Sequence, residues 1–173
     1  VQMKSNDELG SLAGSVNNIV QTIQQFSTEQ RIMSDQHTAG MISYQMPAQN
    51  FKGKYEELGT GINTLVKAHI DVKMRVVDVI TQYANGNFAQ DMDRLPGEKA
   101  KITKSIDDVK ANLQSVNNEL AMLIDAAQRG NLSVRGDVSK FQYTFREMVG
   151  GMNQMLDAIV QPFNEASDVL KQM

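Results

Sequence analysis

The sequence predicts an all-α protein built from long helices. Three prolines occur in its 173 residues, and six of the twelve glycines bracket three short segments, Gly40 to Gly53, Gly86 to Gly97 and Gly130 to Gly136. The stretches between these segments contain few helix breakers and have an amphipathic spacing. No sustained alternation of apolar and polar residues signals a strand. We therefore expect four helices, at residues 6–39, 55–85, 97–129 and 140–173, joined by three connectors.

Local signals predict where three of these helices begin. Ser5 followed by Glu8 forms a capping-box pattern, and Ser139 followed by Gln142 repeats it. Pro96 is expected at a first helical position, with an acidic residue in the first turn beside the positive end of the helix dipole. Each of these patterns predicts a helix start within a few residues.

Composition excludes several classes of function. The net charge of −3, from 17 basic and 20 acidic residues, argues against a nucleic-acid partner. The absence of Cys excludes disulfides and thiolate metal sites and suits a reducing compartment, so a cytoplasmic location is expected. No apolar run approaches the ~20 residues of a membrane span, and no signal peptide is present. No cluster or loop predicts a catalytic residue, a metal or a cofactor. Because the chain starts with Val and ends inside a helical pattern, it looks like a fragment.

An internal repeat organises the chain. Gly40, Gly86 and Gly130 are spaced by 46 and 44 residues, and an aliphatic anchor followed by Asn or Asp stands 24 residues before each of them. The anchors are Val16, Ile62 and Ile106, with Met152 followed by Asn153 as the fourth copy. A constant helix with a connector of variable length is the signature of a tandem repeat of one supersecondary unit.

A narrow apolar stripe, here called the seam, runs from each anchor. At alternating steps of three and four residues, 24 of 28 positions are apolar, the exceptions being Gln30, His37, His69 and Pro162. Such a 3.5-residue period is typical of a coiled coil rather than of a globular helix. The residues assigned to a bundle core are Val16, Ile19, Ile23, Ile62, Leu65, His69, Ile106, Val109, Leu113, Met152, Met155 and Ile159. His37 and His69 are interpreted as core or near-core residues rather than as catalytic or metal-binding ones.

The connectors predict parallel helices. A stretch of 10–15 extended residues reaches roughly 33–50 Å, enough to return along a half-helix and start the next helix in the same direction. One chain supplies too few helices to bury the seam, so two chains are expected to share each bundle. The residues expected to pack the connectors are Gly40, Ile42, Met46, Gly86, Phe88, Met92, Gly130 and Leu132. In the third connector Gly136 replaces the second apolar residue, so close packing of this connector requires that Val134 or Val138 substitute for it.

These features resemble the HAMP domain. The resemblance rests on the Gly-x-apolar-x-x-x-apolar opening of the connectors and on the acidic-Leu-Gly motifs Glu8-Leu9-Gly10 and Glu57-Leu58-Gly59. Gln161-Pro162-Phe163 is similar to the start of a HAMP first helix, which marks Pro162 as a junction. The stretch from His69 to Lys110 resembles the poly-HAMP region of soluble bacterial aerotaxis-type chemoreceptors, which are methyl-accepting chemotaxis proteins.

The resemblance implies an order of units and a role. A truncated unit contributes its second helix at 1–24, complete units follow at 25–70, 71–114 and 115–159, and 160–173 starts a further unit or a continuing signalling helix. The family forms elongated homodimeric parallel four-helix bundles that relay signals between sensor and output domains of a chemoreceptor or sensor kinase. The alternative is a HEAT-like solenoid acting as a binding scaffold, because such repeats run about 40–47 residues.

Overall fold

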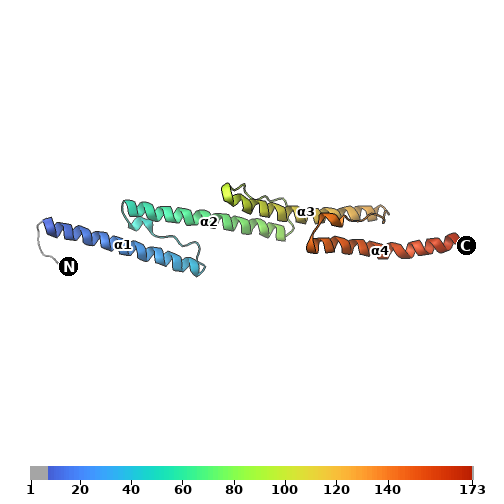
Figure 1. Cartoon of the computed structure of the whole chain (residues 1–173), viewed down its shortest axis with the longest axis horizontal. Coiled ribbons are helices and arrows are strands. Elements are labelled where there is room, and N and C mark those ends of the chain that lie inside the picture. Colours follow the sequence, from blue (N-terminus) through green and yellow to red (C-terminus); the bar gives the residue numbers. More distant parts are fainter. Residues whose placement is uncertain (1–7, 173) are drawn as a thin grey trace. The chain divides into compact units, whose positions relative to one another are not determined.

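The computed structural model describes residues 8–172, which form long helices joined by connectors (Figure 1). Its helices are α1 (Glu8–Thr38), α2 (Lys54–Ala84), α3 (Ala100–Gln128) and α4 (Tyr143–Gln172). Single 3₁₀ turns, η1 (Ala48–Asn50), η2 (Gly97–Lys99) and η3 (Val138–Lys140), precede α2, α3 and α4. The described residues contain no strand, and none of their helices is long and apolar enough to cross a membrane. The all-α prediction is confirmed, with helix ends within three residues of those expected.

The described residues form two compact bodies, 8–75 and 76–172. In the first body, α1 and the beginning of α2 run side by side in the same direction, and the first connector (39–53) returns between them (Figure 1). In the second body, the second connector (85–99) leads to α3 and the third connector (129–142) leads to α4. Each connector returns along its helices, so the expected parallel arrangement is confirmed for α1 with α2 and for α3 with α4.

Glycine ends the first three helices in the same way. Gly40, Gly86 and Gly130 have positive φ angles of 90°, 79° and 77°. The amide of each glycine donates to the carbonyl three residues earlier, and the amide that follows it donates to the carbonyl five residues earlier, as in Asn87 N to Gln82 O at 2.9 Å. This pair of bonds is a Schellman motif, and it requires a left-handed residue that glycine adopts without a steric penalty.

The expected helix starts at Pro96 and Ser139 are wrong. Pro96 is extended, with a ψ of 160°, and Gly97 with a φ of 58° turns the chain into η2 before α3 begins at Ala100. Ser139 lies inside η3, where its amide and hydroxyl donate to Asp137 Oδ1 at 3.0 and 2.6 Å. Ser139 therefore binds Asp137 and does not cap α4. Ser5, the other expected cap, lies outside the described residues.

Tyr143 occupies a strained backbone position. Its φ is 48°, and the residues at the same distance before the anchors of α2 and α3 are Gly53 at 60° and Gly97 at 58°. A left-handed conformation costs a residue with a Cβ roughly 1–2 kcal/mol. The ring is 86% exposed, so little packing compensates for this cost.

Replacing Tyr143 by Gly is therefore expected to stabilise the protein. Relief of the left-handed strain outweighs the extra chain entropy of glycine, about 0.4–1 kcal/mol, so the net gain is up to about 1 kcal/mol. Thermal unfolding of Tyr143→Gly beside Tyr143→Ala measures it, because alanine removes the ring and keeps the Cβ. Equal midpoints for the two variants would show that the backbone stores no strain there.

Candidate functional site: the connectors

The second apolar residue of a connector is the buried one. Met46 is 1% exposed and Met92 is 2% exposed, whereas Phe88 and Leu132 are half-buried and Ile42 is exposed. Met92 belongs to a core cluster with Val79, Tyr83 and Ile106, and Phe88 packs at the edge of that cluster. In the second connector the deepest contact is therefore made by the methionine.

In the third connector the small residue lies on the connector and the large one on the helix. A Cβ added to Gly136 would lie 2.7 Å from Cγ1 of Val149, which is fully buried on α4. In the first connector the glycine is on the helix, because a Cβ on Gly59 would lie 2.7 Å from Cε of Met46. Met46 and Gly136 both stand six residues after their connector glycine, and Gly59 and Val149 both stand three residues before their anchor.

Val138, one of the two valines considered as a substitute, packs against the core cluster of Val116, Phe141 and Val149, but the space directly beside Gly136 is filled by Val149. Both Val134 and Val138 are half-buried. In the first connector the side chain of Met46 fills the space beside the helix. In the third connector a side chain of the helix fills the corresponding space.

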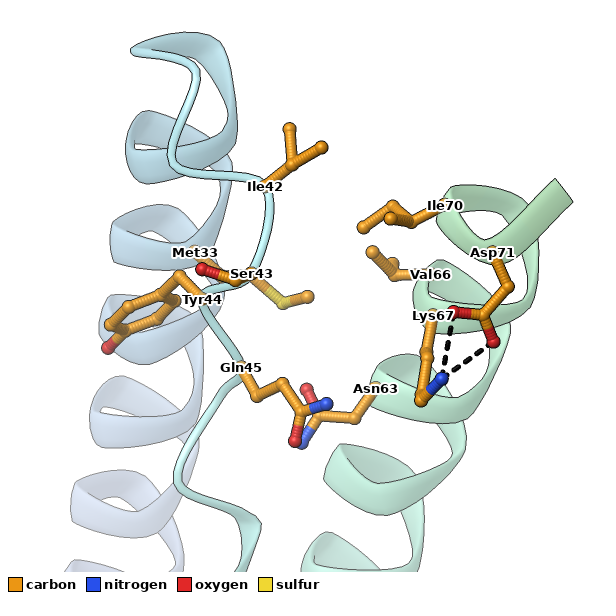
Figure 2. A pocket seen from close by; sticks show the side chains of 10 residues that line it. All are labelled: Met33, Ile42, Ser43, Tyr44, Gln45, Asn63, Val66, Lys67, Ile70 and Asp71. Carbon is orange, nitrogen blue, oxygen red and sulfur yellow. Dashed lines mark hydrogen bonds and ion pairs between the residues drawn. The ribbon is translucent and has the colours of Figure 1, made fainter. Parts of the chain in front are cut away.

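An asparagine clamps the buried connector residue in both places. Asn63 Oδ1 accepts from Met46 N at 2.9 Å, and its Nδ2 donates to Met46 O at 2.7 Å. Asn153 repeats both bonds on Gly136, at 2.8 and 2.9 Å. Figure 2 shows Asn63 reaching from α2 toward the connector beside Gln45. Sequence reasoning recorded these asparagines as part of the repeat but assigned them no role.

The second connector uses other groups for the same task. Asp107 stands where the other repeats have asparagine, and it pairs with Arg94 instead of holding the backbone. The buried Thr103 takes the backbone contacts, since its hydroxyl donates to Asp93 O at 2.7 Å and accepts from Leu95 N at 3.2 Å.

One carbonyl of each connector also receives a side-chain donor. His37 Nε2 lies 2.9 Å from Tyr44 O, and Tyr83 Oη donates to Gln90 O at 2.9 Å. Each of these carbonyls belongs to the residue four positions after the connector glycine. In the third connector the corresponding carbonyl is that of Val134, and Arg135 Nη1 donates to it at 2.8 Å. The half-buried His37 thus contacts a connector, a role that periodicity alone did not predict.

Comparison with known proteins identifies this helix–connector–helix pattern. Residues 72–114 match the model of HAMP N-terminal domain 3, and residues 140–173 match that of the HAMP domain. Two successive segments of the chain thus match HAMP domains. It is also similar to the methyl-accepting chemotaxis protein McpB of Pseudomonas aeruginosa, with 51% identity over 82 residues, which cover 47% of this chain and 12% of that protein. The chain thus aligns with a small part of that relative's length.

The HAMP matches decide between the two classes of function considered. HAMP domains of chemoreceptors are signal-relay elements rather than catalytic ones, and the similarity to a chemotaxis receptor supports that role. The HEAT-like scaffold receives no support from the comparisons. Among the described residues, no group of three or more His, Cys, Asp or Glu side chains could hold a metal ion.

The seam of the HAMP helices lies largely on the surface of the single chain. Of the residues assigned to the bundle core, Ile106 is buried, Ile62, Leu113 and Met152 are half-buried, and His69 is exposed. The others expose between 41% and 61% of their surface: Val16, Ile19, Ile23, Leu65, Val109, Met155 and Ile159. Pro162 lies exposed within the continuous helix α4.

Ion pairs hold the second HAMP connector to its helices. Lys110 Nζ lies 2.7 Å from Asp91 Oδ1, with most of the lysine side chain covered. This hydrogen bond lowers the pKa of Asp91 and raises the pKa of Lys110. The charged forms of both groups are therefore favoured by the packed connector.

The third connector is held by two further pairs. Arg135 Nη2 lies 2.6 Å from Asp157 of α4, and Lys140 Nζ lies 2.5 Å from Glu119 of α3, whose side chain is 7% exposed. The bond to Glu119 raises the pKa of Lys140, and the bonds from Ser139 lower the pKa of Asp137. The connector thus has a charged contact on each of its two helices.

A cavity of about 220 Å³ opens between α1, the first connector and α2. Ile42 faces Val66 and Ile70 across it, and Lys67 is paired with Asp71 on its rim (Figure 2). The side chains that face one another here are aliphatic, as in an incompletely filled core.

Proposed function

We propose that this chain relays conformational change along a homodimeric parallel helical bundle, from a sensor to an output domain of the same chemoreceptor-type protein in the cytoplasm. The observation that carries the proposal is the row of exposed seam residues, left uncovered although the connectors are packed. Burying apolar surface contributes about 25 cal/mol per Å², so a second copy aligned on the same stripe gains stability along every helix. The proposed units are those at 25–70, 71–114 and 115–159, flanked by partial units at 1–24 and 160–173.

The continuity of α2 supports a relay. This single helix of 31 residues starts after the first connector and ends at the second, so it is the second helix of one unit and the first of the next. A change of packing at one end of an unbroken helix is carried to the other end as a rotation or shift. Coupling of about 1–3 kcal/mol between neighbouring units would be sufficient.

Cysteine cross-linking tests the dimer. The segment has no Cys, so single cysteines at Val16 and Ile159 report only on those positions. A disulfide between identical positions needs Cα atoms within about 7 Å, and both sites are expected to cross-link in a parallel dimer in register. Lys104 is the control, because it lies five residues from Val109 on the opposite side of α3 and its side chain is exposed. A monomer by mass without cross-links at either site would overturn the proposal.

A further inference from the structure

We propose that Asn63 and Asn153 are positioning residues of the relay, each fixing the register of a connector on the helix that follows it. Their effect on signalling rests on the proposed function, whereas the clamp itself rests only on the geometry of the single chain. Nothing in the HAMP matches or in the similarity to the chemotaxis receptor assigns a role to these two side chains.

The chemistry of the clamp needs an amide side chain. Asparagine offers an acceptor and a donor side by side, so it satisfies the N–H and the C=O of a single backbone residue. The clamped residues, Met46 and Gly136, are both buried, and an unpaired backbone group at such a place costs free energy. Two bonds to one residue fix both the height of the connector along the helix and its rotation about the helix.

The clamp recurs where the packing contact differs. Met46 meets a glycine of α2, whereas Gly136 meets a valine of α4, so the sizes of the two partners are exchanged. The asparagine nevertheless stands in the same place, one residue after the anchor, and makes the same two bonds. The shared element of the two connectors is therefore the hydrogen-bonded register, and either distribution of side-chain volume is compatible with it.

The second connector shows what happens without the amide. A carboxylate only accepts hydrogen bonds, so Asp107 cannot hold both groups of one backbone residue. The clamp is absent there, and the backbone contacts move to Thr103 one turn earlier. The amide donor is thus the atom group that distinguishes a clamped connector from an unclamped one.

The consequence for a relay is mechanical. A clamped connector moves as one piece with its second helix, because two hydrogen bonds join them near the middle of the connector. When the second helix rotates, the connector follows and changes its contact with the first helix, where His37 meets the carbonyl of Tyr44. Asn63 thereby ties motion of α2 to the end of α1.

Hydrogen–deuterium exchange of the full-length protein tests the clamp. In Asn63→Asp the donor is lost at pH 7, and exchange of residues 41–53 is expected to rise about tenfold or more over the unsubstituted protein. At pH 4 the protonated carboxyl regains a donor, so the ratio of the two rates is expected to fall toward one. Asn63→Leu supplies no donor at any pH, and its ratio is expected to stay high.

The ionisable groups around Asn63 do not confuse this comparison. Lys67 and Asp71 line the same cavity and are paired with each other, Tyr44 lies on the connector, and His37 contacts that connector from α1. All four are present in both proteins, so the ratio compares two proteins that differ only at residue 63. Asn112→Asp is the matched control, since Asn112 is exposed on α3 and its substitution is expected to leave the ratio at one.

The third connector provides an internal control for folding. Exchange of residues 129–142 is expected to remain unchanged in Asn63→Asp and to rise in Asn153→Asp, with the reverse for residues 41–53. An unchanged rate at pH 7 in the clamped connector, or a ratio that is the same at both pH values, would overturn the proposal. Failure of the cysteine cross-links together with the expected exchange would remove the relay and leave the clamp, so the two failures are distinguishable.

Discussion

Replacing Gly136 by Met is expected to destabilise the protein by about 3 kcal/mol, since overpacking a well-filled core costs roughly 1–3 kcal/mol or more. The new Cβ would lie 2.7 Å from Val149, which is fully buried and cannot move into solvent. Val149→Ala alone is expected to cost about 2 kcal/mol, because it removes buried methyl groups and leaves a cavity.

The double variant is expected to lose less than the sum of the two single losses. With alanine at 149, the methionine side chain occupies the volume that the valine filled, as Met46 does beside Gly59. Residues in direct contact commonly couple by 0.5–3 kcal/mol. Alanine is used because Gly150 and Gly151 follow, and a third glycine would weaken the helix for a separate reason.

Urea unfolding of the four proteins in this cycle measures the coupling. The clamp is unaffected, because Asn153 binds the backbone of Gly136 and its side chain is not replaced. Strictly additive losses would show that residues 136 and 149 do not share one space. A coupling of at least 1 kcal/mol would establish that helix and connector exchange volume between units.

The helices could be predicted from sequence because their ends are fixed by nearby residues. Gly40, Gly86 and Gly130 each end a helix through bonds to carbonyls three and five residues earlier, and such signals lie within one turn. The helix starts expected at Pro96 and Ser139 were wrong because other nearby residues decide the local structure. Ser139 donates to Asp137, and the chain turns at Gly97 directly after Pro96.

The connector contacts could be predicted only in part, since they join residues far apart in the chain. Met46 and Met92 can be predicted from their residue type and spacing. Gly136 has no side chain, so the sequence does not show which residue fills the space beside it. Val149 lies thirteen residues later on a helix, and nothing local distinguishes it from Val134 or Val138. The recurring asparagine after each anchor was visible, but its partners are backbone atoms, which carry no sequence signal.

Met92→Ala is the second large effect, with an expected loss of about 3 kcal/mol. Truncation of a fully buried methionine costs roughly 2–5 kcal/mol, and Met92 touches a cluster that joins the end of α2 to α3. Phe88→Ala is expected to cost less, about 2 kcal/mol, although the ring is larger, because it is half-buried and meets Tyr83 at a centroid distance of 6.0 Å. The sequence predicted that both Phe88 and Met92 pack this connector, and their different burial ranks the two effects.

The dependence on protein concentration distinguishes packing within one chain from packing between two chains. Met92 is covered by its own chain, so the loss of stability in Met92→Ala is expected to be the same in dilute and concentrated protein. If a second chain covers the exposed part of Phe88, the loss in Phe88→Ala grows with concentration, since association stabilises the native state by mass action. Urea unfolding of both variants at two concentrations, spaced a hundredfold, measures this. A concentration-dependent loss for Met92 would contradict its place inside the single chain, whereas a constant loss for Phe88 would leave its ring outside the dimer.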